Sequence, residues 1–378
     1  MTAPTRKPRI ILAHDWLVGR RGGELVLDAI IRALEPTTHV TAILTLFDDG
    51  QPITRAIDDL PRHAVFTGHR ALKLRRHLLP LYPRAAATLS RELARRHADN
   101  PFDLLISTHS AAIKSIKPPP GLPHLCYCHT PARYIWSQTS QYGSASIPLA
   151  LIRPLYKAWD RRTARRVSTF LANSTHTAEE VRRCYRAQSH VVFPPVRTRF
   201  FTPADERTDR TTRGTHWLAA GALVPYKRFD LAIAAANMAS HPLTIVGTGP
   251  ELDRLKRLAG PTVTFAHADT DNQMRDHYRR ARLLIQPQLE DFGITALEAQ
   301  ACGTPVVAFA KGGARDTVKD DATGALFHHQ STDALLAAID RCPKHHALAC
   351  REHAESFSEA AFTESFLPHA RALFRART

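Results

Sequence analysis

The sequence predicts an α/β protein built from two successive parallel sheets, each covered by helices. Short apolar runs alternate with amphipathic stretches from end to end, which is typical of β–α units. The alternation breaks at Phe193-Pro194-Pro195-Val196 and the polar stretch that runs on to Gly214, because two prolines neither continue a helix nor pair in a central strand. A length of 378 residues suits two domains. We therefore expect a first domain at 1–195 and a second at 196–354, with a C-terminal helix at 355–378 that packs back on the first.

The first half contains five continuous apolar runs of the kind found in strands buried on both faces. The expected strands are 9–14, 40–44, 103–108, 123–128 and 169–173. The expected helices between them are 24–34, 85–97 and 177–186. Asn173-Ser174-Thr175 supplies N-cap side chains for the last helix.

The second half repeats the pattern. Its expected strands are 216–220, 243–246, 262–265, 282–286 and 305–309. Its expected helices are 228–239, 250–259, 272–280, 293–302 and 332–341. In such sheets ligands bind at the carboxyl ends of strands, so the strand-to-helix turns are where chemistry is expected.

The composition, with 44% apolar and 23% charged residues, is that of a globular chain and excludes wholesale disorder, collagen and disulfide scaffolds. The net charge of +16 is unevenly placed. Residues 1–200 hold 30 Lys and Arg against 14 Asp and Glu, whereas residues 201–378 hold 21 of each. This asymmetry predicts that the first half meets an anionic partner: nucleic acid, a lipid surface or a phosphorylated substrate.

Two glycine turns follow strands. The first runs from His14-Asp15-Trp16 to Gly22-Gly23, and the second is Gly247-Thr248-Gly249-Pro250, where Pro250 suits a first helical position. Glycines there would let backbone amides approach an anion. The alternative is simple turn geometry, and the G-x-G-x-x-G spacing of dinucleotide sites is missing.

A third turn, 129–134, follows the strand at 123–128. His129 stands at the carboxyl end of this buried strand, where an imidazole is placed for hydrogen bonding or acid–base work. With 21 His in the chain, a surface or packing role is the competing interpretation.

The most specific constellation is 287–299, in which an acidic loop leads into a helix at Gly293. The helix N-terminus attracts anions such as a diphosphate. Glu290 in the loop and Glu298 in the helix could reach sugar or ribose hydroxyls. The alternative is that Glu290 and Asp291 only complement the helix dipole and Glu298 is surface charge.

These stretches resemble the family 4 glycosyltransferases. The Glu290…Glu298 pair within EDFGITALEAQACGTPVVA is similar to the family's E-x7-E nucleotide-sugar signature. Further similar stretches lie at 14–30, 126–136, 172–185, 191–196, 221–233, 245–251 and 311–318. The HDWL, CHTPARYIW and ALVPYKR segments most resemble bacterial mannosyltransferases that build polysaccharides. The resemblance implies the GT-B fold, in which two Rossmann-like domains face a central cleft.

The resemblance also implies roles for individual residues. The residues matching catalytic positions are His129, Lys227 and Glu290. Those matching donor-binding positions are Gly22, Gly23, Lys227, Arg228, Gly247, Gly249, Glu290, Phe292, Gly293, Ile294 and Glu298. Those expected to bind the acceptor are His14, Asp15, Arg133 and Tyr134. Lys227 would hold the donor diphosphate and Glu298 the ribose. Many members carry an Arg where this chain has Ala222.

The implied reaction is metal-independent and retaining, with a hexose moved from a nucleotide-sugar, GDP-mannose foremost, to a glycan or lipid-linked sugar. No further cofactor is expected. A nucleotide-sugar epimerase or phosphorylase of the same fold is the alternative enzyme class. A nucleic-acid-binding protein would use the basic half but leaves 290–298 unexplained, so we expect no nucleic-acid partner.

Two basic segments, 69–84 and 157–166, combine Arg and Lys with apolar residues. This pattern suits a segment lying on anionic lipid, and a helix packed on the core with solvated Arg is the alternative. The N-terminus lacks the apolar run of a signal peptide. We therefore expect a cytoplasmic enzyme, peripheral on the inner membrane.

Overall fold

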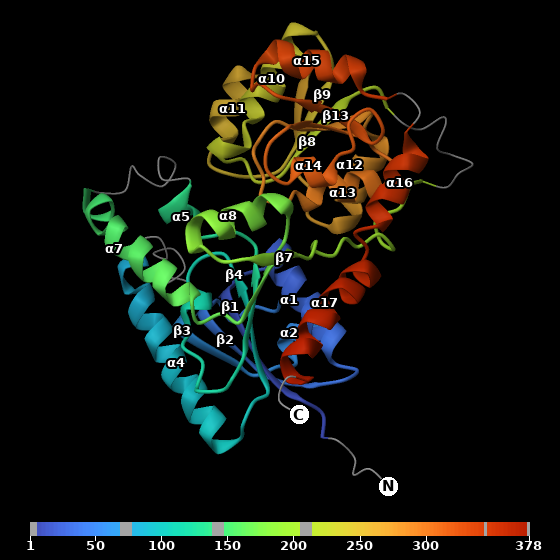
Figure 1. Cartoon of the computed structure of the whole chain (residues 1–378). Helices are drawn as coiled ribbons and strands as arrows, with labels where there is room; N and C mark the ends of the chain where they lie inside the picture. Colours follow the sequence, from blue (N-terminus) through green and yellow to red (C-terminus); the bar gives the residue numbers. More distant parts are fainter. Residues whose placement is uncertain (1–5, 69–77, 138–146, 205–213, 344–345, 376–378) are drawn as a thin grey trace. The chain divides into compact units, whose positions relative to one another are not determined.

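The computed structural model describes residues 6–68, 78–137, 147–204, 214–343 and 346–375 (Figure 1). The chain forms two compact units, Met1–Phe193 with Phe362–Thr378, and Pro194–Ala361. Each has a parallel sheet covered by helices, which confirms the predicted fold class.

The first unit contains a seven-stranded parallel sheet in the order β3-β2-β1-β4-β5-β6-β7. Its strands are β1 Arg9–Leu17, β2 His39–Asp48, β3 Arg62–Thr67, β4 Leu104–His109, β5 His124–Cys128, β6 Thr169–Ala172 and β7 Ser189–Val191. Its helices are α1 Gly22–Leu34, α2 Arg55–Asp58, η1 Leu79–Leu81, α4 Tyr82–Asp99, η2 Ile113–Ser115, α5 Arg133–Trp136, α7 Ile147–Ala164, α8 Thr175–Tyr185 and α17 Glu359–Arg375. The N-cap predicted within Asn173-Ser174-Thr175 is Ser174, whose Oγ accepts a hydrogen bond of 2.9 Å from the amide of Thr177.

Alternate residues of β1 enter opposite layers of the core, as the two-residue period of a strand requires. Ile10 and Leu12 pack in one layer with apolar residues of α1 and α17. Ile11 and Ala13 pack in the other layer with apolar residues of α4. Figure 1 shows α1 and α17 on one side of this sheet and α4 on the other. A strand covered on both faces explains the continuous apolar run.

The second unit contains a six-stranded parallel sheet in the order β10-β9-β8-β11-β12-β13. Its strands are β8 Trp217–Ala220, β9 Leu243–Val246, β10 Val263–Ala266, β11 Leu283–Gln286, β12 Val306–Phe309 and β13 Gly324–Phe327. Its helices are η3 Pro225–Lys227, α10 Phe229–Met238, α11 Leu252–Leu258, α12 Asp271–Arg280, α13 Ile294–Ala301, α14 Ala314–Thr317, α15 Thr332–Arg341 and α16 Ala347–Glu355. One face packs on α10 and α15, and the other on α12 and α13.

The sequence analysis missed strands β3, β7 and β13. β3 and β7 are partly exposed edge strands, so they lack a continuous apolar run. β13 begins at Gly324, where a Cβ would lie 1.9 Å from the carbonyl oxygen of Val306. That close approach explains a glycine inside a strand.

Two local predictions were wrong. β1 continues to Leu17, so His14, Asp15 and Trp16 are strand residues and not part of the following turn. Helix α11 begins at Leu252, which leaves Pro250 in the turn before it.

The end of the chain returns to the first unit. Phe362, Phe366 and Ala370 of α17 are buried in the core layer that also contains α1. The ring of Phe362 lies 6.1 Å from that of Tyr127 on β5. In the described ranges, no helix combines the length and apolar character needed to cross a membrane.

Candidate functional site

The strand order of the second sheet reverses between β8 and β11. These two strands are paired neighbours although they are far apart in sequence. The loops after these strands therefore leave the same edge of the sheet side by side. Ligands bind at such topological switch points in open α/β sheets. The loop after β8 carries Lys227, and the loop after β11 carries Glu290.

Lys227 and Glu290 form an ion pair between these two loops. The Nζ of Lys227 donates to Oε1 of Glu290, and both side chains are largely buried, at 14% and 16% exposed. Gln288 donates to the same oxygen at 3.1 Å. The contact brings together two residues that the sequence analysis assigned to catalysis, and it holds an ammonium and a carboxylate at the edge where a substrate is expected.

The backbone around Glu290 is held by the loop after β12. The amide of Gly313 donates to the Glu290 carbonyl at 2.8 Å, and Gly312 forms a parallel bridge with Glu290. A Cβ at Gly312 would lie 2.1 Å from the Glu290 carbonyl oxygen, and Gly312 has a φ of 70°. Only glycine allows this approach, so the KGGA segment at 311–314 positions Glu290.

Arg228 adopts a left-handed backbone conformation at the start of α10, with a φ of 52°. Its Nε lies 3.2 Å from the carboxylate of Asp230, and NH1 lies 3.5 Å from Oε1 of Gln330. Gln330 in turn donates to the Pro287 carbonyl at 2.6 Å. Arg228 is thus linked to the loop that carries Glu290.

Helix α13 begins next to the Lys227–Glu290 ion pair. Gly293 is its N-cap, with a φ of 98°, and half-buried Ile294 is its first residue. The amides of a helix's first turn lack intrahelical acceptors and favour an anion. Phe292 is only 4% exposed, with its ring 5.9 Å from that of Phe357. Its side chain belongs to the core, which leaves its backbone for any donor contact.

Glu298, one turn further along α13, is held by a neighbouring helix. The hydroxyl of Tyr278 on α12 donates to its Oε2 at 3.1 Å. Burial raises the pKa of Glu298 to about 6, against the opposing effects of Arg197 and of the Tyr278 hydrogen bond. The residue is therefore not ordinary surface charge.

Gly247 and Gly249 make room for the loop after β8. A Cβ at these glycines would lie 2.0 Å from the carbonyl oxygen of Gly221 and 2.3 Å from that of Leu223. Backbone bonds join the segments, from Gly221 to Val246 and from Leu223 to Thr248. In the structure, Gly247 and Gly249 allow close packing against the loop that carries Lys227. Their contact with a nucleotide stays a prediction.

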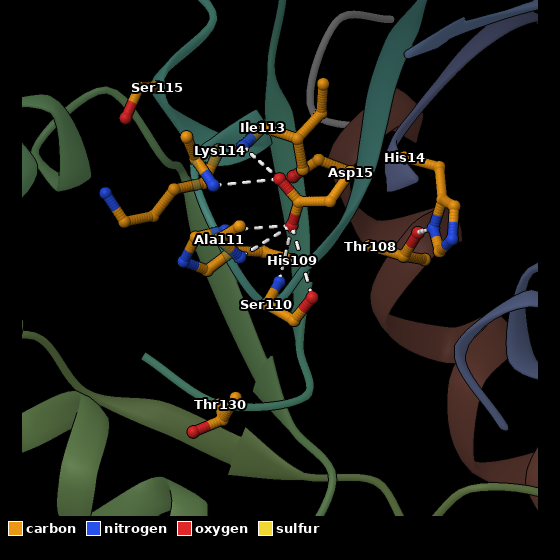
Figure 2. Close-up of polar contacts among 12 residues, drawn as sticks. His14, Asp15, Thr108, His109, Ser110, Ala111, Ile113, Lys114, Ser115 and Thr130 are labelled. Carbon is orange, nitrogen blue, oxygen red and sulfur yellow. Dashed lines mark hydrogen bonds and ion pairs between the residues drawn. The ribbon is translucent and has the colours of Figure 1, made fainter. Parts of the chain in front are cut away.

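The first sheet has its own switch point, between β1 and β4. Asp15 at the end of β1 accepts four backbone hydrogen bonds of 2.6 to 2.8 Å from the turn after β4, as Figure 2 shows. The donors are the amides of Ser110, Ala111, Ala112 and Ile113. Burial alone would raise the pKa of Asp15, but the imidazole of His109, with Nδ1 3.6 Å from Oδ2, and the hydrogen bonds from this turn hold it well below its ordinary value. Asp15 is 1% exposed, so its carboxylate serves the fold, and acceptor binding by it stays untested.

The rings of His14 and His129 both approach Gly23. A Cβ on Gly23 would lie 3.5 Å from Cε1 of His14 and 3.9 Å from Nε2 of His129. His14 is fixed through Nδ1 by the hydroxyl of Thr108, at 2.5 Å (Figure 2). Burial lowers the pKa of His14 to about 4 and that of His129 to about 3. Both rings are neutral near pH 7 and can exchange hydrogen bonds with a hydroxyl group.

The Nε2 atom of His129 is buried without a hydrogen-bond partner among the described residues. An unpaired buried imidazole nitrogen is costly unless a ligand or water satisfies it. Contact of His129 with a substrate stays a prediction.

The sequence analysis did not identify Glu24 as a buried carboxyl group of the candidate site. It follows Gly22 and Gly23 in the first turn of α1. Its carboxyl accepts from the amide of Val18 at 3.4 Å and is 4% exposed. Burial raises its pKa to about 7. Local sequence gave no signal for this, because an acidic residue is ordinary in a first helical turn.

Arg133 and Tyr134 belong to the short helix α5. Tyr134 is 8% exposed, and its hydroxyl donates to the Ala111 carbonyl at 3.3 Å. Its ring packs against Tyr82 and Tyr156. This side chain is therefore part of the core, while Arg133 is half-buried.

The structure describes only part of the basic segment 69–84 but all of the basic segment 157–166. Residues 69–77 of the first lie outside the described residues, and beyond them Leu79 and Tyr82 pack into the core. In the second, Lys157 Nζ and Arg161 Cζ lie 5.0 and 5.2 Å from the ring centroid of Trp136. Arg162, Arg165 and Arg166 of this segment are exposed.

Over the ranges that the structure describes, no three His, Cys, Asp or Glu side chains gather as a metal ion would require.

Two family models match the chain: "Glycosyltransferase Family 4" over residues 20–200 and "Glycosyl transferases group 1" over residues 206–363. Among curated relatives, a D-inositol 3-phosphate glycosyltransferase of Mycolicibacterium gilvum is 29% identical over 57% of this chain and 54% of its own length. The protein of that name from Mycolicibacterium smegmatis is 33% identical over 51% of this chain and 50% of its own. The chain thus spans about half the length of the curated relatives it matches.

Solved structures share the fold over nearly the whole chain. Sucrose-phosphate synthase from Thermosynechococcus elongatus has a TM-score of 0.75 at 20% identity, covering 98% of this chain and 100% of that one. Anabaena Alr3699/HepE, solved in complex with UDP and glucose, has a TM-score of 0.67 at 17% identity, covering 96% and 99%.

Proposed function

Because the chain belongs to the family 4 glycosyltransferases and has their GT-B fold, we propose that it moves a hexose from a nucleotide-sugar to a glycan or lipid-linked sugar. We propose GDP-mannose as the donor, retention of anomeric configuration and no metal requirement. The observation that carries the proposal is the Lys227–Glu290 pair next to the N-terminus of α13.

The chemistry follows from charge. When a diphosphate leaves an anomeric carbon, negative charge develops on the leaving oxygen. A lysine ammonium and the free amides of a helix N-terminus stabilise that charge from fixed positions. Lys227 and the first turn of α13 supply these two elements, and the Glu290 carboxylate accepts a hydrogen bond from a sugar hydroxyl.

Retention requires the acceptor hydroxyl to approach from the side the diphosphate leaves. The departing phosphate can then accept the acceptor proton, so neither Glu290 nor Glu298 needs to act as a nucleophile. The neutral ring of His129 suits hydrogen bonding to a substrate hydroxyl.

The donor is tested by a thermal-shift screen with GDP-, UDP-, ADP- and dTDP-sugars, since a ligand that binds the folded state raises the apparent Tm. GDP-mannose should give the largest shift. A larger shift with UDP-glucose would replace the donor assignment and leave the enzyme class intact.

The enzyme class is tested by product analysis. A transferase consumes donor in step with acceptor glycosylation, whereas an epimerase converts the donor without an acceptor and a phosphorylase requires phosphate. A gel shift that stays negative at physiological salt would exclude nucleic-acid binding.

The basic excess of the first half supports an anionic acceptor presented at a membrane, with the protein peripheral on its cytoplasmic face. Flotation with anionic vesicles tests this: retention at low salt and release at high salt are expected. Inositol 3-phosphate is a useful second acceptor to test, because the curated relatives are named D-inositol 3-phosphate glycosyltransferases. Its glycosylation without vesicles would replace the membrane acceptor with a small phosphorylated one.

A further inference from the structure

We propose that Tyr278 is a positioning residue for donor binding: its hydroxyl holds the Glu298 carboxylate charged and in the orientation that a ribose diol requires. The inference rests on the proposed function of Glu298. It adds a residue from a different helix, α12, to the donor site of the second unit.

The contact between Tyr278 and Glu298 is a hydrogen bond from a buried phenol. Tyr278 is 1% exposed, and its hydroxyl donates to Oε2 of Glu298 at 3.1 Å. The bond occupies one of the two carboxylate oxygens and fixes the rotation of the group. A vicinal diol donates best to a carboxylate whose orientation is already set.

Tyr278 is itself held firmly. Its ring packs edge-on against Phe201, with centroids 5.8 Å apart. Its backbone carbonyl accepts a hydrogen bond of 2.6 Å from the hydroxyl of Thr304. The phenol therefore reaches Glu298 from a fixed support.

Charged groups around Glu298 oppose one another. Arg197 and Asp271 act on Glu298 with opposite signs, Arg197 favouring the charged form and Asp271 disfavouring it. These two residues are paired to each other at 2.7 Å, so their net effect is reduced. On α16, which also packs against α13, Arg351 is bound to Glu355 and to the Ala301 carbonyl. The Tyr278 hydroxyl is the neutral donor that favours the carboxylate.

Donor affinity should depend on pH through the protonation of Glu298. Burial already brings the pKa of Glu298 to about 6, close to the working range of a cytoplasmic enzyme. Removing the hydrogen bond favours the protonated form and moves the pKa upward. A protonated Glu298 loses the acceptor strength that a diol requires, so donor affinity in the variant should fall earlier as the pH drops.

The experiment compares Tyr278→Phe with the full-length wild type. A carboxyl carbon NMR titration of Glu298 should show its midpoint rising by about one unit, which corresponds to a tenfold change in equilibrium constant. The dissociation constants of GDP-mannose and UDP-glucose are then measured from pH 5 to pH 8. The ratio of variant to wild-type Kd should be about tenfold larger at pH 5 than at pH 8, by the same conversion.

Thr304→Val is the matched control, because it removes the bond to the Tyr278 backbone and leaves the phenol in place. It should lower Tm without moving the Glu298 midpoint. An unchanged midpoint in Tyr278→Phe, or a Kd ratio that is the same at every pH, would overturn the inference.

Failure of the proposed function is distinguishable. If Glu298→Gln binds both nucleotide-sugars as tightly as the wild type, the ribose role of Glu298 is wrong. If Glu298→Gln weakens binding while Tyr278→Phe leaves titration and binding unchanged, only the role of Tyr278 is wrong.

Discussion

Lys227 and Glu290 are 63 residues apart in the chain, yet the ammonium of one donates to the carboxylate of the other. The contact exists because β8 and β11 pair in parallel, so the loops after both strands leave the same edge of the sheet. The pair holds the Lys227 ammonium and the Glu290 carboxylate together in front of the N-terminus of α13.

Lys227→Ala should lower kcat about a hundredfold, because one preorganised charge stabiliser of the leaving diphosphate is removed. Steady-state turnover of the donor with acceptor measures this. Lys256→Ala, an exposed lysine on α11, is the control and should behave as wild type. Normal turnover in Lys227→Ala would refute its role.

Glu298→Ala should weaken nucleotide-sugar binding by about tenfold or more, the loss expected for hydrogen bonds to a charged group. Calorimetric titration of the donor measures it. Glu352→Ala, on the exposed side of α16, should bind normally. An unchanged donor Kd in Glu298→Ala would contradict the ribose assignment.

Gly312→Ala should reduce both stability and kcat/KM, since its Cβ would press on the Glu290 carbonyl oxygen and displace the loop. The loss in stability should exceed the roughly 1 kcal/mol of a residue at positive φ. Gly50→Ala separates the two effects: it has a similar φ, 74°, with nothing within 4 Å of its Cβ position. Equal losses in the two variants would show that the contact with Glu290 is unimportant.

Asp15→Asn should destabilise the first unit by about 3 kcal/mol at pH 7, because an amide nitrogen faces backbone N–H donors. The pKa of Asp15 is depressed in the folded chain, so its stabilisation is complete above the ordinary value of about 4 and is lost as the pH falls below it. The difference between wild type and variant in calorimetric unfolding should therefore begin to shrink below pH 4 and close only as the pH approaches the depressed pKa of the folded chain. Asp99→Asn, whose side chain is 68% exposed, should differ little from wild type at any pH.

Lys114→Met should destabilise the first unit by about 3 to 5 kcal/mol, the cost of leaving a buried charge without its partner. Lys114 Nζ lies 2.6 Å from Oδ1 of Asp160, and both side chains are fully buried. The double variant Lys114→Met/Asp160→Asn should lose less than the two single variants together. Strict additivity in denaturant unfolding would contradict the coupling.

Much of the fold was predictable because it rests on local pattern. Continuous apolar runs predicted the central strands, and helix α15 lies where its pattern placed it, at Thr332–Arg341. The edge strands β3 and β7 were missed because a half-exposed strand carries no continuous apolar run.

The sequence predicted which residues belong to the candidate site, but it did not predict how their side chains are arranged. The turn at 287–299 pointed to Glu290 and Glu298 through residue type and position. Nothing local indicated that Asp15 is saturated by four amides, that Tyr134 faces the core, or that Tyr278 reaches Glu298 from another helix.

The sequence by itself determined that the chain has two parallel sheets and which turns carry polar residues, because these follow from hydrophobic period and turn chemistry along neighbouring positions. Only the tertiary structure decided which of those polar side chains are already bonded within the fold and which stand next to one another. The physical reason is that strand order brings distant loops to one edge of a sheet, and desolvation and hydrogen bonding at that edge set the charge of each group.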